Sequence, residues 1–312
     1  MRSREKRSKS SNPRPQAFSM VCRPDLEHYR DDLFSGNWVS EIGFSLEGHP
    51  MTRFTTGGES GEDEKKHVGD EYFLESNDKI RFFFEEGFSG ILCCFCFLFA
   101  TAKNGGVADA FDSSGTLTKP KHRAINKIGH ALHMLSPSFR NTTLTSINKH
   151  IAHDLGFRDA RVLQSMIICK QPEIGGAVPP HQDSTFLYTD PPSAVGFWYA
   201  LEDANPGNGC LSFIPGSHKW APIQKRFVRL PEGGTGFEDL KHGCGDGVKE
   251  RFGKVEKGEE RFVVVPVRSG ALALIDGNVL HKSGGNTSES SRWIYTFHVR
   301  SPLYLSSLPP WE

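Results

Sequence analysis

The chain of 312 residues is 37% apolar and 24% charged, which is typical of a globular protein and excludes a fibre or a wholly disordered chain. Its 37 basic and 37 acidic side chains balance, so no net charge recruits nucleic acid or a membrane surface. The 32 glycines, 19 prolines and 23 phenylalanines favour many short strands joined by tight turns over long helices.

The chain ends and the cysteines bear on location. Residues 1 to 20 begin with the basic run MRSREKRSKSSNPRP, which predicts a disordered tail, with a nuclear or anionic-surface address as the alternative. No apolar signal segment opens the chain, the seven cysteines are an odd number, and the terminal PPWE differs from a peroxisomal Ser-Lys-Leu signal. We therefore expect a reducing, cytoplasmic environment.

Between this tail and residue 159 the predicted elements are mixed. Residues 55 to 70 are polar and rich in glycine and are expected to form a loop, whereas KIRFFFEE, residues 79 to 86, is expected to form a strand. Apolar residues at spacings of three and four predict a helix over INKIGHALHML, residues 125 to 135, and another over SINKHIAHDLGF, residues 146 to 157.

An unusual apolar run, FSGILCCFCFLFATAKNGG, occupies residues 88 to 106. Its uncharged part, residues 90 to 102, is shorter than the roughly 20 residues that span a bilayer as a helix, so no membrane span is predicted. One interpretation is an apolar element that packs on the domain or on a membrane. We favour a splice-variant or unspliced segment that the fold does not require, because the run lacks periodic polarity, and expect its deletion to raise soluble yield and thermal stability.

After residue 159 short apolar runs alternate with turns rich in Gly, Pro and Asn. The pattern predicts about seven or eight strands with no helices between them. It favours an antiparallel sandwich or barrel of the jelly-roll, cupin-like kind. We therefore predict a mainly β protein with flanking helices and a single domain over residues 21 to 312.

The stretch PPHQDSTFLY, residues 179 to 188, contains a His-x-Asp triplet. Residues i and i+2 of a strand face the same side, so His181 and Asp183 can share one cation while Gln182 faces away. The triplet alone is weak evidence, because such spacing also arises by chance. His281, in DGNVLHKSGGN after the apolar strand GALALI, is the candidate for a second histidine ligand.

Two imidazoles and one carboxylate on one face of an octahedron leave the other positions open, which suits ferrous iron that binds a cosubstrate and O2 together. Arg292, in SSRWIYTFH on the expected next strand, offers two parallel donors to the carboxylate of a dicarboxylate cosubstrate. Taken singly, His181 and His281 have an ordinary alternative as solvated turn residues, and Arg292 has one as a surface cation. Their joint occurrence favours the metal site, and His218 is assigned no role.

A resemblance to the phytanoyl-CoA dioxygenase family of Fe(II)- and 2-oxoglutarate-dependent oxygenases is carried by three segments: PPHQDSTFLYTDP, FWYALEDANPGNGCLSFIPGSHK and GALALIDGNVLHKSGGNTSESSRWIYTFH. It covers residues 70 to 86 and 120 to 300. The resemblance implies a double-stranded β-helix core over about residues 160 to 300.

The resemblance also implies roles for individual residues. Iron is held by His181, Asp183 and His281, and the C5 carboxylate of 2-oxoglutarate pairs with Arg292 and the hydroxyl of Ser283. Matching positions give three further neighbours of the cosubstrate: Lys127, Met166 and Trp198.

Those last three roles rest on the resemblance, because from the residues alone Met166 and Trp198 are core candidates and Lys127 is a solvent-facing helix residue. The family implies hydroxylation of a small-molecule or lipid-like, acyl-CoA-type substrate, with O2 consumed and succinate and CO2 released. The alternative is a non-catalytic, cupin-like metal-binding or interaction protein. No nucleic acid is expected as a partner, and the sequence does not predict the oligomeric state.

Access to the site depends on two further features. A CoA-binding mouth needs basic residues, and the sequence leaves open whether Lys219, Lys225, Arg226 and Arg229 gather there or form a solvated charge run. The region from 231 to 261, rich in glycine and charge, is expected to form a flexible lid over the mouth.

Overall fold

The computed structural model describes residues 18–21, 70–85, 110, 112, 116–231, 233–240 and 246–301, the first of these ranges by its backbone alone. Its strands are β1 (Phe18–Val21), β2 (Arg81–Phe84), β3 (Ile125–His130), β4 (Arg161–Lys170), β5 (Val178–His181), β6 (Val195–Ala200), β7 (Leu211–Phe213), β8 (Lys225–Arg229), β9 (Thr235–Asp239), β10 (Val263–Val265), β11 (Leu272–Asp276), β12 (His281–Ser283) and β13 (Arg292–Arg300). Its α-helices are α3 (Asp70–Leu74), α4 (Leu132–Leu135), α5 (Pro137–Thr143), α6 (Ser146–Asp154), α7 (Asp183–Phe186), α8 (Ser217–Trp220) and α9 (Asp246–Glu256). Short 3-10 turns occupy Glu75–Asn77, Lys121–Arg123 and Pro206–Asn208.

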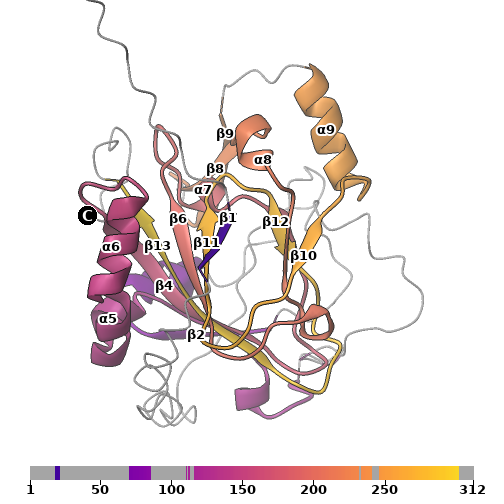
Figure 1. Cartoon of the computed structure of the whole chain (residues 1–312). Helices are drawn as coiled ribbons and strands as arrows, with labels where there is room; N and C mark the ends of the chain where they lie inside the picture. The colour runs from indigo at the N-terminus through magenta and orange to yellow at the C-terminus, as the bar shows by residue number, and fades with distance from the viewer. Residues whose placement is uncertain are drawn as a thin grey trace, which may run out of the picture.

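The strands form two antiparallel sheets and a separate hairpin (Figure 1). The larger sheet has the order β1-β11-β6-β13-β4-β3-β2, the smaller has the order β10-β7-β12-β5, and β8 pairs with β9. Apolar side chains of the two sheets meet in one cluster, with Ala273 and Ile294 from the larger sheet and Leu211 and Phe213 from the smaller. Two sheets packed in this way form a jelly roll, so the predicted fold class is confirmed.

Alternation along the central strands gives the larger sheet two apolar faces. On β6, Phe197 and Tyr199 belong to the cluster that includes Phe139 of α5 and Ala152 of α6. The residue between them, Trp198, belongs instead to the cluster between the sheets. This is the two-residue period of a strand buried on both sides. Figure 1 shows the resulting layers, with α5 and α6 outside the sheet beside β4 and β13.

The predicted helix over residues 125 to 135 is wrong. Its first part is strand β3, which pairs with β2 and β4, and only the short α4 is helical. At Gly129 an added Cβ would lie only 3.0 Å from the Cβ of Met166 on β4, so the glycine permits the close pairing of the two strands. Sheet pairing therefore outweighed the helix-like spacing of the apolar residues.

Two other predicted elements are confirmed. The predicted strand over residues 79 to 86 is confirmed as the shorter β2. The second predicted helix is confirmed as α6, whose N-cap Thr145 accepts a hydrogen bond from the backbone N–H of Asn148. This helix ends before Gly156, whose φ of 95° lies in the left-handed region.

Several expectations fall on the edges of the described chain. The loop predicted over residues 55 to 70 lies outside it except for the first residue of α3, and the apolar run from 88 to 106 lies wholly outside it. Strand β1 includes residues 18 to 20 of the predicted tail, and the other residues of that tail lie outside the described chain. The predicted flexible lid contains β9 and α9, so it is not a simple loop. Among the described residues no helix is long and apolar enough to cross a membrane.

Candidate metal centre

The three predicted metal ligands converge in the structure. His181 ends β5 and His281 begins β12, and these two residues are direct partners in the antiparallel pair. The Oδ1 atom of Asp183 lies 3.5 Å from Nε2 of His181 and 3.7 Å from Nε2 of His281. One ligand atom from each residue lies within 4.8 Å of the others, a spacing that a single ion can bridge. Their role as ligands remains a prediction.

The route to this convergence differs from the predicted one. Asp183 is not on the strand of His181 but is the first residue of α7, so a turn directs the carboxylate toward the histidines. Gln182 is buried and donates its amide to the carbonyls of Ala221, at 2.9 Å, and Asn278, at 2.6 Å. The predicted outward-facing residue is thus an internal anchor of the turn that carries the carboxylate.

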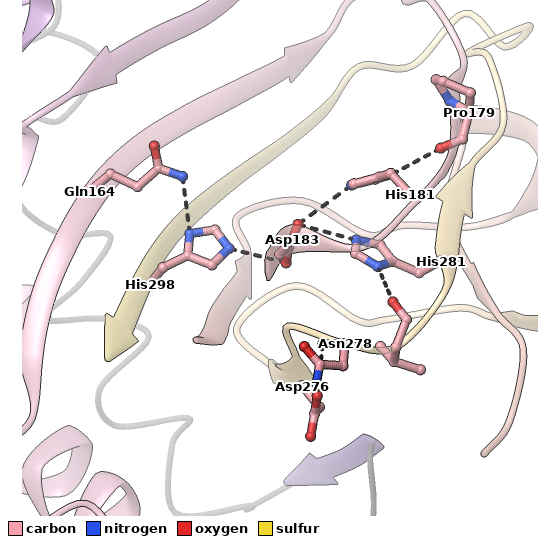
Figure 2. Close-up of polar contacts among 9 residues, drawn as sticks. Gln164, Pro179, His181, Asp183, Asp276, Asn278, His281 and His298 are labelled. Atoms are coloured by element: carbon pink, nitrogen blue, oxygen red, sulfur yellow. Dashed lines mark hydrogen bonds and ion pairs between the residues drawn. The ribbon is translucent and has the colours of Figure 1, made fainter. Parts of the chain in front are cut away.

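Both histidines are oriented by their own backbone neighbourhood (Figure 2). Nδ1 of His181 lies 2.9 Å from the carbonyl oxygen of Pro179, and Nδ1 of His281 lies 3.1 Å from that of Val279. A carbonyl oxygen can only accept, so each Nδ1 carries the proton and each neutral ring keeps its Nε2 lone pair for a cation. Nε2 is the nitrogen that faces Asp183 in both cases.

The electrostatics keep Asp183 anionic. Burial alone would raise the pKa of Asp183, but His281, His298 and His181 hold that pKa well below its usual value. Burial opposes the charged form of His181, yet its contact with Asp183 outweighs burial and raises the pKa of His181. Burial and the proximity of His181 lower the pKa of His281 to about 4. With both rings neutral, the centre offers one carboxylate and two imidazole donors, a donor set that fits Fe(II).

Arg292 begins β13 on the face directed toward the cavity, and it is 2% exposed. Its Nη1 donates to the carbonyl of Gly209 at 2.9 Å, and its guanidinium lies 5.6 Å from the ring centroid of Trp198. Its Nε has no hydrogen-bond partner among the described residues. Burial lowers the pKa of Arg292 to about 10, so the group is still charged at neutral pH. A buried cation with an unused donor suits an anionic ligand.

The remaining predicted residues line the same cavity as the triad and Arg292. Ser283 lies on β12 two residues beyond His281, Met166 is buried on β4, and Trp198 is buried on β6. Lys127 lies on β3 and faces the cavity, so the solvent-facing helical position expected from the residues alone is wrong. The structure brings together all eight predicted site residues.

Comparison with known proteins agrees with this geometry. The sequence model of the phytanoyl-CoA dioxygenase family (PhyH) matches residues 98–294. The chain belongs to the phytanoyl-CoA dioxygenase family. It is 44% identical over 255 residues to a phytanoyl-CoA dioxygenase domain-containing protein 1 homolog of Caenorhabditis elegans, and the aligned region covers 80% of this chain and 75% of the relative. It is 42% identical over 252 residues to phytanoyl-CoA dioxygenase domain-containing protein 1 of Bos taurus, covering 80% of this chain and 75% of that protein.

A solved structure supports the fold alone. AviO1 from Streptomyces viridochromogenes matches with a TM-score of 0.51 over 95% of this chain and 94% of AviO1, at 17% sequence identity. Membership of the dioxygenase family and the donor set at residues 181, 183 and 281 agree with the expected dependence on Fe(II) and 2-oxoglutarate. The resemblance found in the sequence is therefore confirmed.

In this member of the phytanoyl-CoA dioxygenase family, sequence reasoning missed His298 and Gln164. His298 lies on β13, and its Nε2 is 3.2 Å from Oδ2 of Asp183 (Figure 2). The amide of Gln164, on β4, reaches Nδ1 of His298 at 3.4 Å. A signal was available, because His298 is an even number of residues from Arg292 on one strand and must share its face.

Basic residues do gather at the cavity. Lys225, Arg226 and Arg229 of β8 line it, whereas Lys219 on α8 is not among the lining residues. Arg226 is paired with Glu238 of β9 at 2.8 Å. The hairpin of β8 and β9 therefore contributes cationic groups to the cavity in this family member.

Proposed function

We propose that this protein is an Fe(II)- and 2-oxoglutarate-dependent dioxygenase that hydroxylates a small-molecule or lipid-like, acyl-CoA-type substrate and releases succinate and CO2. The observation that carries the proposal is a cluster of two histidines and one aspartate in the same cavity as a buried arginine with an unused donor. Membership of the family supports the reaction class. The arrangement of the predicted residues around one cavity supports their individual roles.

The chain's own residues have distinct tasks in this proposal. His181 and His281 offer neutral Nε2 atoms and Asp183 offers Oδ1 to the ion, which when bound activates O2 for attack on the substrate. Arg292 and Ser283 bind the distal carboxylate of 2-oxoglutarate. Three neighbours shape the space for the rest of that molecule: Lys127, Met166 and Trp198.

The cavity supports a substrate with an apolar body and an anionic part. Its volume is about 2050 Å³, above the usual range of roughly 300–1,000 Å³ for small-molecule sites. Its aromatic wall includes Phe186, Phe227 and Phe237, whose rings contact one another. Lys225 lies over the ring of Phe237 at 4.7 Å and adds positive charge beside this wall. A cytoplasmic location and a single domain over residues 21 to 312 remain predictions.

Succinate production tests the proposal. The purified chain is loaded with Fe(II) without oxygen, O2 and 2-oxoglutarate are added, and succinate is measured by mass spectrometry. We expect iron-dependent succinate from wild type and baseline succinate from Asp183→Ala, which removes the one carboxylate of the triad. Asp154→Ala, at an exposed position on α6, is the matched control and should behave as wild type.

The result that overturns the proposal is baseline succinate from folded wild-type protein. If that protein still binds iron, but 2-oxoglutarate does not change the visible absorption of the metal, the non-catalytic cupin-like alternative is favoured. Untargeted metabolite turnover, comparing wild type with Asp183→Ala, then identifies the substrate class.

A further inference from the structure

We propose that His298 is a positioning residue that holds the metal-binding carboxylate of Asp183 through its second oxygen. The inference rests on the proposed function, because it takes Asp183 as a metal ligand. The two carboxylate oxygens have different neighbours: Oδ1 faces His181 and His281, whereas Oδ2 lies 3.2 Å from Nε2 of His298 (Figure 2). His298 is buried on the cavity face of β13.

Gln164 fixes the proton on the correct nitrogen of His298. The two residues are direct partners in the pairing of β4 with β13, and the amide Nε2 of Gln164 lies 3.4 Å from Nδ1 of His298. An amide nitrogen donates, so Nδ1 accepts and the ring proton of neutral His298 resides on Nε2. That N–H is then directed at Oδ2 of Asp183.

Gly196 leaves the space for this contact. It is the partner of His298 on the other side of β13, in strand β6. A Cβ at residue 196 would lie 3.1 Å from Nε2 of His298 and 3.5 Å from Oδ2 of Asp183. A glycine inside a central strand weakens the strand, so its presence here is explained by the close approach of imidazole and carboxylate.

The hydrogen bond from His298 determines which carboxylate oxygen of Asp183 is available to a cation. With Oδ2 engaged by the N–H of His298, Oδ1 is the oxygen left to coordinate. A carboxylate held in this way would offer a bound ion one oxygen atom, Oδ1, and not two. Loss of such an outer partner typically lowers metal affinity about 10- to 100-fold.

Binding of Mn(II) to the full chain tests the inference without any turnover, with free Mn(II) measured from its electron paramagnetic resonance signal. We expect His298→Leu to weaken binding about 10- to 100-fold. His298→Gln should bind close to wild type, because its amide nitrogen reaches the place of Nε2 and donates. His298→Asn should be as weak as His298→Leu, because its shorter amide cannot reach Oδ2. His133→Leu, at another buried histidine of the cavity, is the matched control and should bind as wild type.

Each outcome of the Mn(II) titrations either supports or overturns the positioning role of His298. Should His298→Leu fail to fold, the polar pair His298→Gln and His298→Asn still separates a donor in reach from one out of reach. Near wild-type binding by His298→Asn, or equal weakening by Asn and Gln, overturns the positioning role while leaving the metal site standing. If wild type binds no Mn(II), or Asp183→Ala binds it equally well, the metal site itself fails and this inference fails with it.

Discussion

Arg292→Met should remove most of the affinity for 2-oxoglutarate while leaving the metal site in place. The guanidinium is 2% exposed, makes one hydrogen bond through Nη1 to the carbonyl of Gly209 and has an unused Nε. Without it, the distal carboxylate of bound 2-oxoglutarate would lose its proposed cationic partner. Breaking one side of a buried ion pair costs about 3–5 kcal/mol, which corresponds to roughly a 100- to 4,000-fold rise in Kd.

Arg292→Lys separates charge from geometry. The lysine keeps the positive charge but loses the paired planar donors, so we expect a smaller loss, roughly tenfold, equivalent to about one charged hydrogen bond. The assay is an oxygen-free titration of 2-oxoglutarate into the Fe(II)-loaded protein, followed by the visible absorption of the metal. Arg300→Met, at a buried arginine at the opposite end of the same strand, is the control. A Kd for Arg292→Met within a few-fold of wild type would refute the assignment of Arg292 as the anchor.

Two further predictions concern stability. Tyr199 donates to Oδ1 of buried Asn148 at 2.5 Å, so Tyr199→Phe should lower the unfolding free energy by about 1–3 kcal/mol in urea titrations, and no change would contradict the role of this bond. Burial and the proximity of Arg292 lower the pKa of Lys170 to about 7, whereas the unfolded chain keeps the usual value of about 10.4. Between these values the unfolded chain binds more protons, so Lys170 makes the unfolding free energy rise with pH, by at most about 1.4 kcal/mol per pH unit. Lys170→Met should show a smaller rise between about pH 7.5 and pH 9, and equal slopes in the two proteins would contradict the shift.

The residues that sequence reasoning placed correctly are those whose local pattern and tertiary setting agree. Arg292 follows a turn and opens an alternating strand, and β13 begins at that residue. The segment from 125 to 130 shows the opposite case, because its apolar spacing fits a helix while its pairing with β2 and β4 makes it a strand. Local pattern could not reveal that pairing, since both partner strands are distant in sequence.

The candidate site likewise has features that the sequence predicts and features that it does not. The three candidate ligand residues could be predicted from the sequence, but the turn that takes Asp183 off the strand could not. That turn depends on hydrogen bonds from Gln182 to the carbonyls of Ala221 and Asn278. Those carbonyls come from loops that no local pattern places beside residue 182. His298 was missed for a different reason: its only sequence signal is its even spacing from Arg292, which places it on the inner face of the strand only once Arg292 is taken to face the site.

The inner face of β13 carries both the proposed cosubstrate anchor, Arg292, and the proposed partner of the metal-binding carboxylate, His298. Arg292 and His298 are six residues apart on one strand, roughly 20 Å by the usual rise, and the even spacing puts both side chains on the cavity side. The opposite face holds this register, because Phe297 stacks on Phe197 and the hydroxyl of Tyr295 lies 2.6 Å from that of Thr143 on α5. A slip of one residue would move both cavity-facing side chains out of the site and expose the aromatic ones to it. The apolar packing beneath α5 and α6 therefore sets where the cosubstrate anchor and the partner of the metal-binding carboxylate lie.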